Sequence, residues 1–212
     1  MPRSPHGFIP SSAEDLLRRR VKAELRKRMR GLRGALPLSA CGARSARIGE
    51  ALLPVLQGAR SVALFWPIEE RHEVDLRGTD ALLRAGGVAI AYPGVDPETG
   101  AMAFRFVESP HEMEEQGFGF REPPLHAREA PPGALDAVVV PALAADPRGH
   151  RIGYGAGYYD RALPPYAGTA KTVTVVFDFQ LLAEVPFTEG DVPVDWIVTD
   201  ARTLRAERGE GA

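Results

Sequence analysis

Apolar residues recur at intervals of three and four in three segments of the chain, which is the spacing of one face of an α-helix. The pattern predicts helices over residues 11–36, 39–57 and 75–85. In the first of these, the apolar stripe comprises Leu17, Val21, Leu25, Met29 and Leu32. We therefore expect this long amphipathic helix to pack against the rest of the protein through that stripe.

Short, continuous apolar runs alternate with the helices and predict strands that are buried on both faces. These runs cover residues 61–66, 88–92, 137–140, 172–177 and 196–199. Residues 102–107 instead alternate between apolar and polar positions, as an edge or antiparallel strand does. A strand, a helix and a strand in succession over residues 61–92 indicate a βαβ unit with parallel strands.

The order of these elements predicts one α/β domain over residues 1–212, in three layers, with a mostly parallel sheet flanked by helices. A loop-rich stretch is expected over residues 109–132, and a short helical piece over 180–184. Residues 1–10 and 202–212 are expected to be flexible, polar tails.

The composition is that of an ordinary soluble protein, since 44% of the 212 residues are hydrophobic and 25% are charged. With 26 basic and 28 acidic residues, the formal charge of -2 leaves no surplus of cations for binding a nucleic-acid backbone. The sequence has no signal peptide and no run of 18 apolar residues, so we expect a cytoplasmic location without membrane attachment. We also expect a monomer, because the sheet and its helices account for the large apolar stripes.

A second, cationic stripe lies on the first predicted helix. Arg18, Lys22, Arg26 and Arg30 follow one another at intervals of four residues and therefore share a face. Periodicity alone favours a solvated surface for such a stripe.

Residues 146–163 carry the densest local signal. They follow the strand predicted over residues 137–140, and ligands of open α/β sheets bind at the carboxyl ends of strands. Glycines at positions 153, 155 and 157 leave backbone N–H groups free to face an anion, which favours phosphate. Taken alone, such a glycine segment is equally typical of a tight turn without a ligand.

Neighbouring side chains and incomplete motifs restrict the kinds of ligand and reaction that this segment can serve. Arg151 can bind a phosphate through two hydrogen bonds, and Asp160 can hold Mg²⁺ against phosphate oxygens. Tyr158 stands where a dinucleotide-binding motif needs its third glycine, and no Gly-Lys-Ser/Thr sequence occurs. Zinc-protease and serine-hydrolase motifs are also incomplete. The single cysteine, Cys41, is expected to be structural.

Together with residues 139–143, segment 146–163 resembles the signature of the 5-formyltetrahydrofolate cyclo-ligases, also called methenyltetrahydrofolate synthetases. Weaker matches follow the family's order along residues 18–200. They are Lys22-Ala-Glu-Leu-Arg26, Glu73-Val-Asp75, Gly117-Phe-Gly-Phe120 with Glu122-Pro123, Phe177 to Gln180, and Gly190 to Asp200. As an ordered set, these matches are far more specific than any one of them.

The resemblance implies a fold like that of NagB, RpiA and the CoA transferases, and an enzyme of one-carbon metabolism. Such an enzyme uses ATP and Mg²⁺ to convert 5-formyltetrahydrofolate to 5,10-methenyltetrahydrofolate, and it releases ADP and phosphate. The formyl oxygen attacks the γ-phosphate, and N10 of the folate then closes the ring. The protein's task is to position the reactants and to neutralise charge.

Matching positions imply the residues of each site. The ATP site would comprise Lys22, Arg26, Arg151, Ile152, Gly153, Tyr154, Gly155, Ala156, Gly157, Tyr158 and Tyr159. The folate site would comprise Trp66, Glu73, Phe118, Tyr154, Gly155, Ala156, Gly157 and Tyr158. Lys22 and Arg151 are the implied catalytic residues, and Asp160 and Asp191 the implied metal ligands.

Two positions depart from the family's pattern. Ala156 stands where many relatives have Gly or Lys, so we expect a negative φ there. The segment before Glu73, Ile68 to His72, is more charged than the rim of a folate pocket requires. Two alternative functions stay open: a non-catalytic relative that binds folate or nucleotide, and another ATP-dependent enzyme on the same fold.

Overall fold

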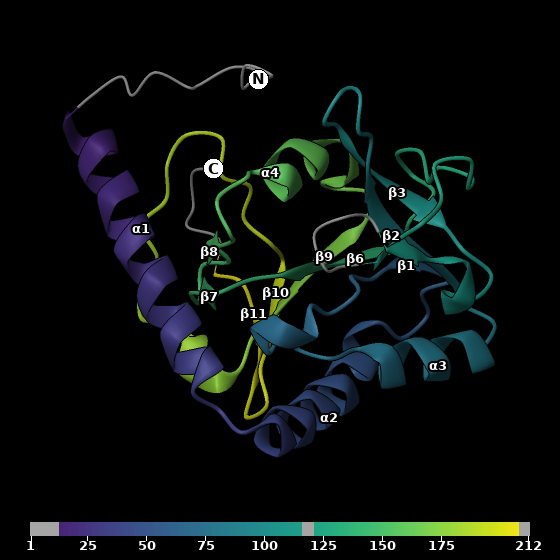
Figure 1. Cartoon of the computed structure of the whole chain (residues 1–212), viewed down its shortest axis with the longest axis horizontal. Coiled ribbons are helices and arrows are strands. Elements are labelled where there is room, and N and C mark those ends of the chain that lie inside the picture. Colours follow the sequence, from purple (N-terminus) through teal and green to yellow (C-terminus); the bar gives the residue numbers. More distant parts are fainter. Residues whose placement is uncertain (1–12, 116–120, 208–212) are drawn as a thin grey trace.

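The computed structural model describes residues 13–115 and 121–207. Within them, the main sheet has seven strands in the order β11-β10-β9-β6-β1-β2-β3 (Figure 1). Their bounds are β1 Ser61–Ala63, β2 Ala89–Val95, β3 Met102–Phe106, β6 Ala137–Pro141, β9 Lys171–Val175, β10 Trp196–Val198 and β11 Thr203–Arg205. The five inner strands are mutually parallel, whereas β3 and β11 pair antiparallel at the two edges. The prediction of a mostly parallel α/β sheet is therefore confirmed.

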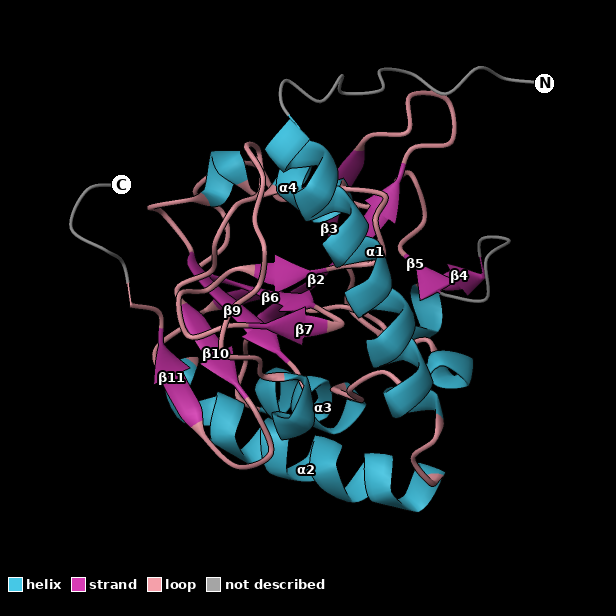
Figure 2. Ribbon diagram, turned by 90° about the vertical axis from the view of Figure 1, so that its left-hand side faces the viewer, coloured by secondary structure: helices cyan, strands magenta, loops and turns pink. Residues whose placement is uncertain are grey.

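Helices cover both faces of this sheet, and one further helix closes an end of it. The α-helices are α1 Ala13–Gly34, α2 Leu38–Val55, α3 Arg77–Ala85 and α4 Tyr158–Ala162. The 3₁₀-helices are η1 Glu69–Arg71, η2 Pro110–Glu112, η3 Pro164–Tyr166 and η4 Asp178–Gln180. Helices α2 and α3 lie on one face and α4 on the other (Figures 1 and 2). No helix in the described ranges is long and apolar enough to span a membrane.

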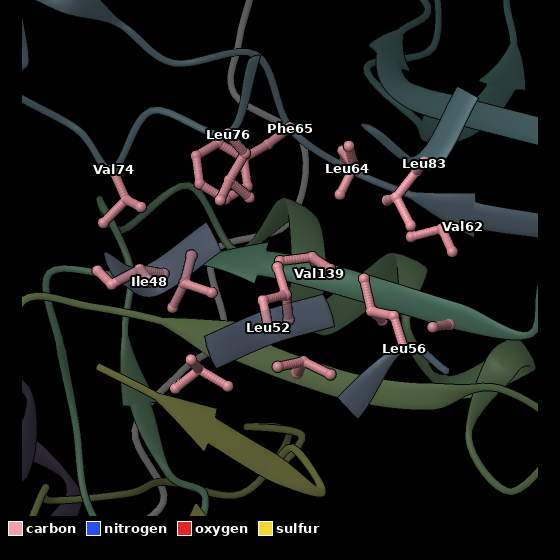
Figure 3. Packing of buried hydrophobic residues seen from close by; sticks show 14 of the residues in the cluster. Ile48, Leu52, Leu56, Val62, Leu64, Phe65, Val74, Leu76, Leu83 and Val139 are labelled. Atoms are coloured by element: carbon pink, nitrogen blue, oxygen red, sulfur yellow. The ribbon is translucent and has the colours of Figure 1, made fainter. Parts of the chain in front are cut away.

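Alternate residues of the inner strands supply the two cores. Val62 and Val139 face α2, where Ile48 and Leu52 pack on them (Figure 3). Val138, the neighbour of Val139, belongs to the core on the opposite face of the sheet. Because both faces are covered, these strands are apolar at successive positions, which is why they appear in the sequence as continuous runs.

Two small hairpins complete the fold. They are formed by β4 Glu114–Glu115 with β5 Arg121–Glu122 and by β7 Ala144–Ala145 with β8 Arg151–Ile152. The β7–β8 hairpin follows the carboxyl end of β6, and α1 packs beside it (Figures 1 and 2). Helix α1 therefore closes the edge of the sheet where ligands of parallel α/β proteins bind.

The buried face of α1 differs from the predicted one. Leu17 and Val21 of the apolar stripe are 61% and 41% exposed, whereas Lys22 is only 6% exposed. Arg33 is also buried, as is Met29 of the apolar stripe, whereas Arg30 of the cationic stripe is exposed. The expectation of an inward apolar stripe was wrong for its N-terminal members Leu17 and Val21, and the expectation of a solvated cationic stripe was wrong for Lys22. That cation is buried because it finds a carboxylate partner in the protein.

The C-terminal segment also departs from prediction. Residues 202–212 were expected to be a polar tail, but Thr203–Arg205 form β11. Leu204 lies opposite Ile197 of β10 and packs against the second core. The short helix expected over residues 180–184 is instead η4, at Asp178–Gln180.

Candidate functional site

A buried carboxylate fixes the turn that leads into the glycine segment. Asp146 is fully buried, and its Oδ1 accepts hydrogen bonds from the backbone N–H groups of Arg148 and His150, each at 3.0 Å. Its Oδ2 accepts a hydrogen bond of 2.9 Å from the backbone N–H of Val185. Three backbone N–H groups donate hydrogen bonds to this buried carboxylate. These bonds fix the turn and thereby the position of β8.

The glycine segment itself requires positive φ at two positions. Gly155 has a φ of 107°, and Gly157, which precedes α4, has a φ of 69°. Ala156 is not among the described residues with positive φ, as its side chain requires. The guanidinium of Arg26 lies beside Gly155, since a Cβ added there would be 3.4 Å from Arg26 Cζ.

For the ATP-dependent activity that the resemblance implies, Gly155→Ala is expected to lower kcat/KM for ATP at least fivefold. A side chain at this φ is strained, and its Cβ would lie in contact with the Arg26 guanidinium. Initial-rate kinetics at varied ATP measure the effect. Gly168→Ala is the matched control, because Gly168 has a φ of 83° and open space at its Cβ. An equal loss of kcat/KM in that control would show that backbone strain far from the glycine segment lowers activity just as much.

Cations from α1 meet the C-terminal part of the chain beside the glycine segment. Lys22 forms an ion pair with Asp191, and its Nζ lies 3.5 Å from Thr188 Oγ1. Asp191 Oδ2 also accepts a hydrogen bond of 2.7 Å from the backbone N–H of Thr188. Arg26 donates through Nε to the carbonyl oxygen of Gly153 at 2.9 Å. Helix α1 is thus bound to both segments through its basic residues.

Arg151 of β8 is the third cation of this group. It donates to Asp160 Oδ1 at 2.7 Å and to the carbonyl oxygen of Val192. Burial lowers the pKa of Arg151, and the negative charges of Asp160 and Asp191 oppose that shift. The pKa of Arg26 is likewise lowered by burial and raised by the same two aspartates. The three cations and two carboxylates therefore share one electrostatic environment.

The carboxylates of this site suit a metal ion that binds together with a phosphate ligand. Asp160 and Asp191 are each paired with a cation. Within the described residues, no group of three or more His, Cys, Asp or Glu side chains could hold a metal by itself. Mg²⁺ is commonly held by one or two carboxylates together with substrate phosphates and water. The role of the two aspartates as metal ligands stays a prediction.

The predicted folate residues Glu73 and Tyr154 are in direct contact. Tyr154 Oη donates to Glu73 Oε1 at 2.6 Å, and the backbone N–H of Ile68 donates to Glu73 Oε2 at 2.9 Å. Burial and the Glu73 charge raise the pKa of Tyr154, so the phenol is protonated. Arg71 lies over the Tyr154 ring, with its Cζ 4.7 Å from the ring centroid. A carboxylate and an aromatic face are thus presented side by side.

The other predicted aromatics take different positions. Trp66 packs edge-on against Tyr92 with 6.0 Å between ring centroids, and it also joins the first core cluster. Tyr158 is 36% exposed, whereas Tyr159 packs against Phe104. Ile152 is buried in a hydrophobic cluster below the loop. Phe118 lies outside the described residues.

Sequence reasoning missed two polar residues of this region. Thr188 bonds to Asp191 and lies near Lys22. Arg33 donates to Tyr154 Oη, and its guanidinium lies 3.8 Å from the Glu73 carboxylate. A signal for Arg33 was available, since it follows Lys22 by eleven residues and therefore lies on the same helical face.

Comparison with known proteins gives a consistent result. The model of the 5-formyltetrahydrofolate cyclo-ligase family matches residues 18–200. A 5-formyltetrahydrofolate cyclo-ligase of Mycolicibacterium smegmatis is 45% identical over 94 residues, which is 43% of this chain and 47% of that protein. The Escherichia coli cyclo-ligase is 28% identical over 152 residues, which is 70% of this chain and 82% of that protein.

Solved structures agree with this result. The 5,10-methenyltetrahydrofolate synthetase of Aquifex aeolicus superposes with a TM-score of 0.77 at 30% identity, covering 91% of this chain and 96% of that one. The Mycoplasma pneumoniae synthetase has the same fold, with a TM-score of 0.69 at 23% identity, covering 84% of this chain and 98% of that one. The match of residues 18–200 to the family model, together with these relatives, shows that the chain belongs to the 5-formyltetrahydrofolate cyclo-ligase family.

Proposed function

We propose that this protein converts 5-formyltetrahydrofolate to 5,10-methenyltetrahydrofolate with ATP and Mg²⁺, releasing ADP and phosphate. One observation carries the proposal beyond family membership. Arg26 bonds to Gly153, Arg151 to Asp160 just after the glycine segment, and Lys22 of the same helical face as Arg26 pairs with Asp191. Tyr154 of that segment bonds to Glu73. A phosphate-binding region and a pterin-binding region would therefore share one site.

The reaction requires charge neutralisation and alignment. When the formyl oxygen attacks the γ-phosphate, a P–O bond forms and ADP leaves. N10 then attacks the activated carbon and loses its proton, which leaves with the departing phosphate, and the methenyl bridge remains. Lys22 and Arg151 would neutralise charge on the transferred phosphoryl group, and backbone N–H groups of the glycine segment would hold its oxygens.

The ion pairs of the site suggest how nucleotide binding would proceed. Lys22 is paired with Asp191, and Arg151 with Asp160. Phosphate would offer the two cations new partners, and the freed carboxylates would hold Mg²⁺, which supplies further neutralisation of the phosphates. The paired carboxylates thus keep the cations in place and compensated before ATP arrives.

The folate would bind on the other side of the glycine segment. The Glu73 carboxylate can accept hydrogen bonds from the N–H groups of the pterin, and the rings of Tyr154 and Trp66 offer faces for stacking. Phosphorylation of the formyl group then takes place between the two regions. A cytoplasmic monomer without a nucleic-acid partner is part of this proposal, and light scattering during gel filtration tests the monomer.

The direct test mixes the purified protein with 5-formyltetrahydrofolate and Mg²⁺, with and without ATP. The methenyl product is followed by its near-ultraviolet absorbance. We expect a rise that needs ATP and that disappears when EDTA removes the metal. The absence of an ATP-dependent rise would contradict the proposal. Binding of both ligands without turnover would instead favour a non-catalytic relative.

A further inference from the structure

Arg33 is a buried cation beside the proposed folate-binding pair. It lies in the last turn of α1, on the helical face that also carries Lys22 and Arg26, and it is 3% exposed. Its guanidinium donates to Tyr154 Oη and lies 3.8 Å from Glu73 Oε1. Its Nε has no hydrogen-bond partner in the part of the chain that the structure describes.

We propose that Arg33 is a positioning residue for the folate half of the site and acts through Tyr154 and Glu73. This inference rests on the proposed function, because it assigns a role within the same reaction. Arg33 donates to Tyr154 Oη and lies beside the Glu73 carboxylate, so its effect on the substrate is transmitted through these two side chains. The residues that would meet the substrate depend on Arg33 for their orientation.

The hydrogen bonds around Glu73 support this role. Each oxygen of the carboxylate accepts from a different donor, Tyr154 Oη on one side and the Ile68 backbone N–H on the other. The Tyr154 hydroxyl in turn accepts from Arg33, so its proton is directed toward Glu73. Without Arg33, the hydroxyl would lose the donor that sets its orientation.

The surroundings of these two groups are mostly apolar. Arg33 and Glu73 line a narrow gap between the end of α1 and the sheet. The other residues that line the gap are Phe65, Val74, Pro141, Ala142 and Val175. Because most of this lining is apolar, the guanidinium supplies the positive charge that the Glu73 carboxylate needs there.

Arg26 and Arg33, both on α1, bind different parts of the glycine segment. Arg26 binds the carbonyl oxygen of Gly153 on the nucleotide side, whereas Arg33 binds the side chain of the next residue, Tyr154. Loss of Arg33 should therefore affect folate binding much more than ATP binding. A purely structural role would affect both ligands, or neither.

Arg33→Met removes the charge and keeps most of the side-chain length. We expect the KM for 5-formyltetrahydrofolate to rise at least tenfold, while the KM for ATP changes less than twofold. Arg33→Lys should recover at least a third of the lost kcat/KM for the folate. The matched control is Arg28→Met, an exposed arginine of the same helix, which should leave both KM values unchanged. Calorimetric titration with 5-formyltetrahydrofolate in the absence of ATP should rank the dissociation constants of the wild type and the variants in the same order as their KM values for the folate.

A folate KM within twofold of the wild type in Arg33→Met would overturn the inference, as would equal increases in both KM values. If Arg33→Met does not fold, Tyr154→Phe tests the same link, because it removes only the hydroxyl between Arg33 and Glu73. That variant should weaken folate binding at least threefold and leave the KM for ATP unchanged. Failure of the proposed function gives a different result, namely a wild type without ATP-dependent methenyl formation.

Discussion

Lys22→Ala is expected to raise the KM for ATP at least tenfold, which corresponds to about 1.4 kcal/mol or more of lost binding free energy. Lys22 is a buried cation on α1 whose ammonium group faces Asp191 beside the glycine segment. Without it, the triphosphate would lose the cation that neutralises its charge at this position. Initial rates at varied ATP and saturating folate measure the change.

The stability of this variant separates a binding role from a structural one. Asp191 retains hydrogen bonds from the backbone N–H and the hydroxyl of Thr188, and its side chain is 20% exposed. The free energy of unfolding should therefore fall by less than about 1 kcal/mol, a shift of about 2–4 °C in Tm. Lys27→Ala, at an exposed lysine of the same helix, is the control. Parallel losses of stability and activity in Lys22→Ala would mark Lys22 as structural.

Gly149→Ala is expected to cause the largest loss of stability, about 3 kcal/mol, or a fall of about 6–12 °C in Tm. Gly149 has a φ of 85°, and a Cβ there would lie 2.3 Å from the carbonyl oxygen of Val194. The two residues are also joined by a backbone hydrogen bond of 3.0 Å from Val194 N to Gly149 O. The added methyl group must therefore push apart two segments that meet at this point.

Gly58→Ala isolates the contribution of the backbone conformation. Gly58 has a φ of 82°, but its Cβ would meet nothing within 4 Å, so only the strain of positive φ remains. We expect a loss of about 1 kcal/mol for that variant. Thermal unfolding followed by circular dichroism compares the two. Equal losses at Gly149 and Gly58 would show that the contact with Val194 does not matter.

The fold follows from features that are local in the sequence. Val138 and Val139 occupy adjacent positions of β6 and face opposite cores, so a strand of this kind must be apolar throughout. Segment 146–163 was also predictable, because positive φ at Gly155 and Gly157 requires glycine in the sequence itself. The antiparallel strand β11 was not predictable, since Thr203–Arg205 is a short edge strand with one partly buried apolar residue, Leu204.

The candidate site depended on contacts between distant segments. Lys22 and Arg26 entered the prediction through resemblance, while periodicity alone favoured a solvated cationic stripe. Arg33 lies on the same face, but its partner Tyr154 is 121 residues away in the chain. No pattern within α1 indicates that a phenol and a carboxylate will be placed opposite that arginine.

The sequence by itself therefore determined the parallel sheet, the glycine segment and the family. The spacing of apolar residues and the need for glycine at positive φ are local properties, so both can be read from the residue types alone. Only the tertiary structure decided which face of α1 is buried and that Arg33 contacts the Glu73–Tyr154 pair. A helix with an apolar and a cationic stripe can bury residues of either one, and α1 buries both Met29 and Lys22. The choice depends on whether the fold supplies carboxylates and carbonyl oxygens that compensate the cost of burying the cations.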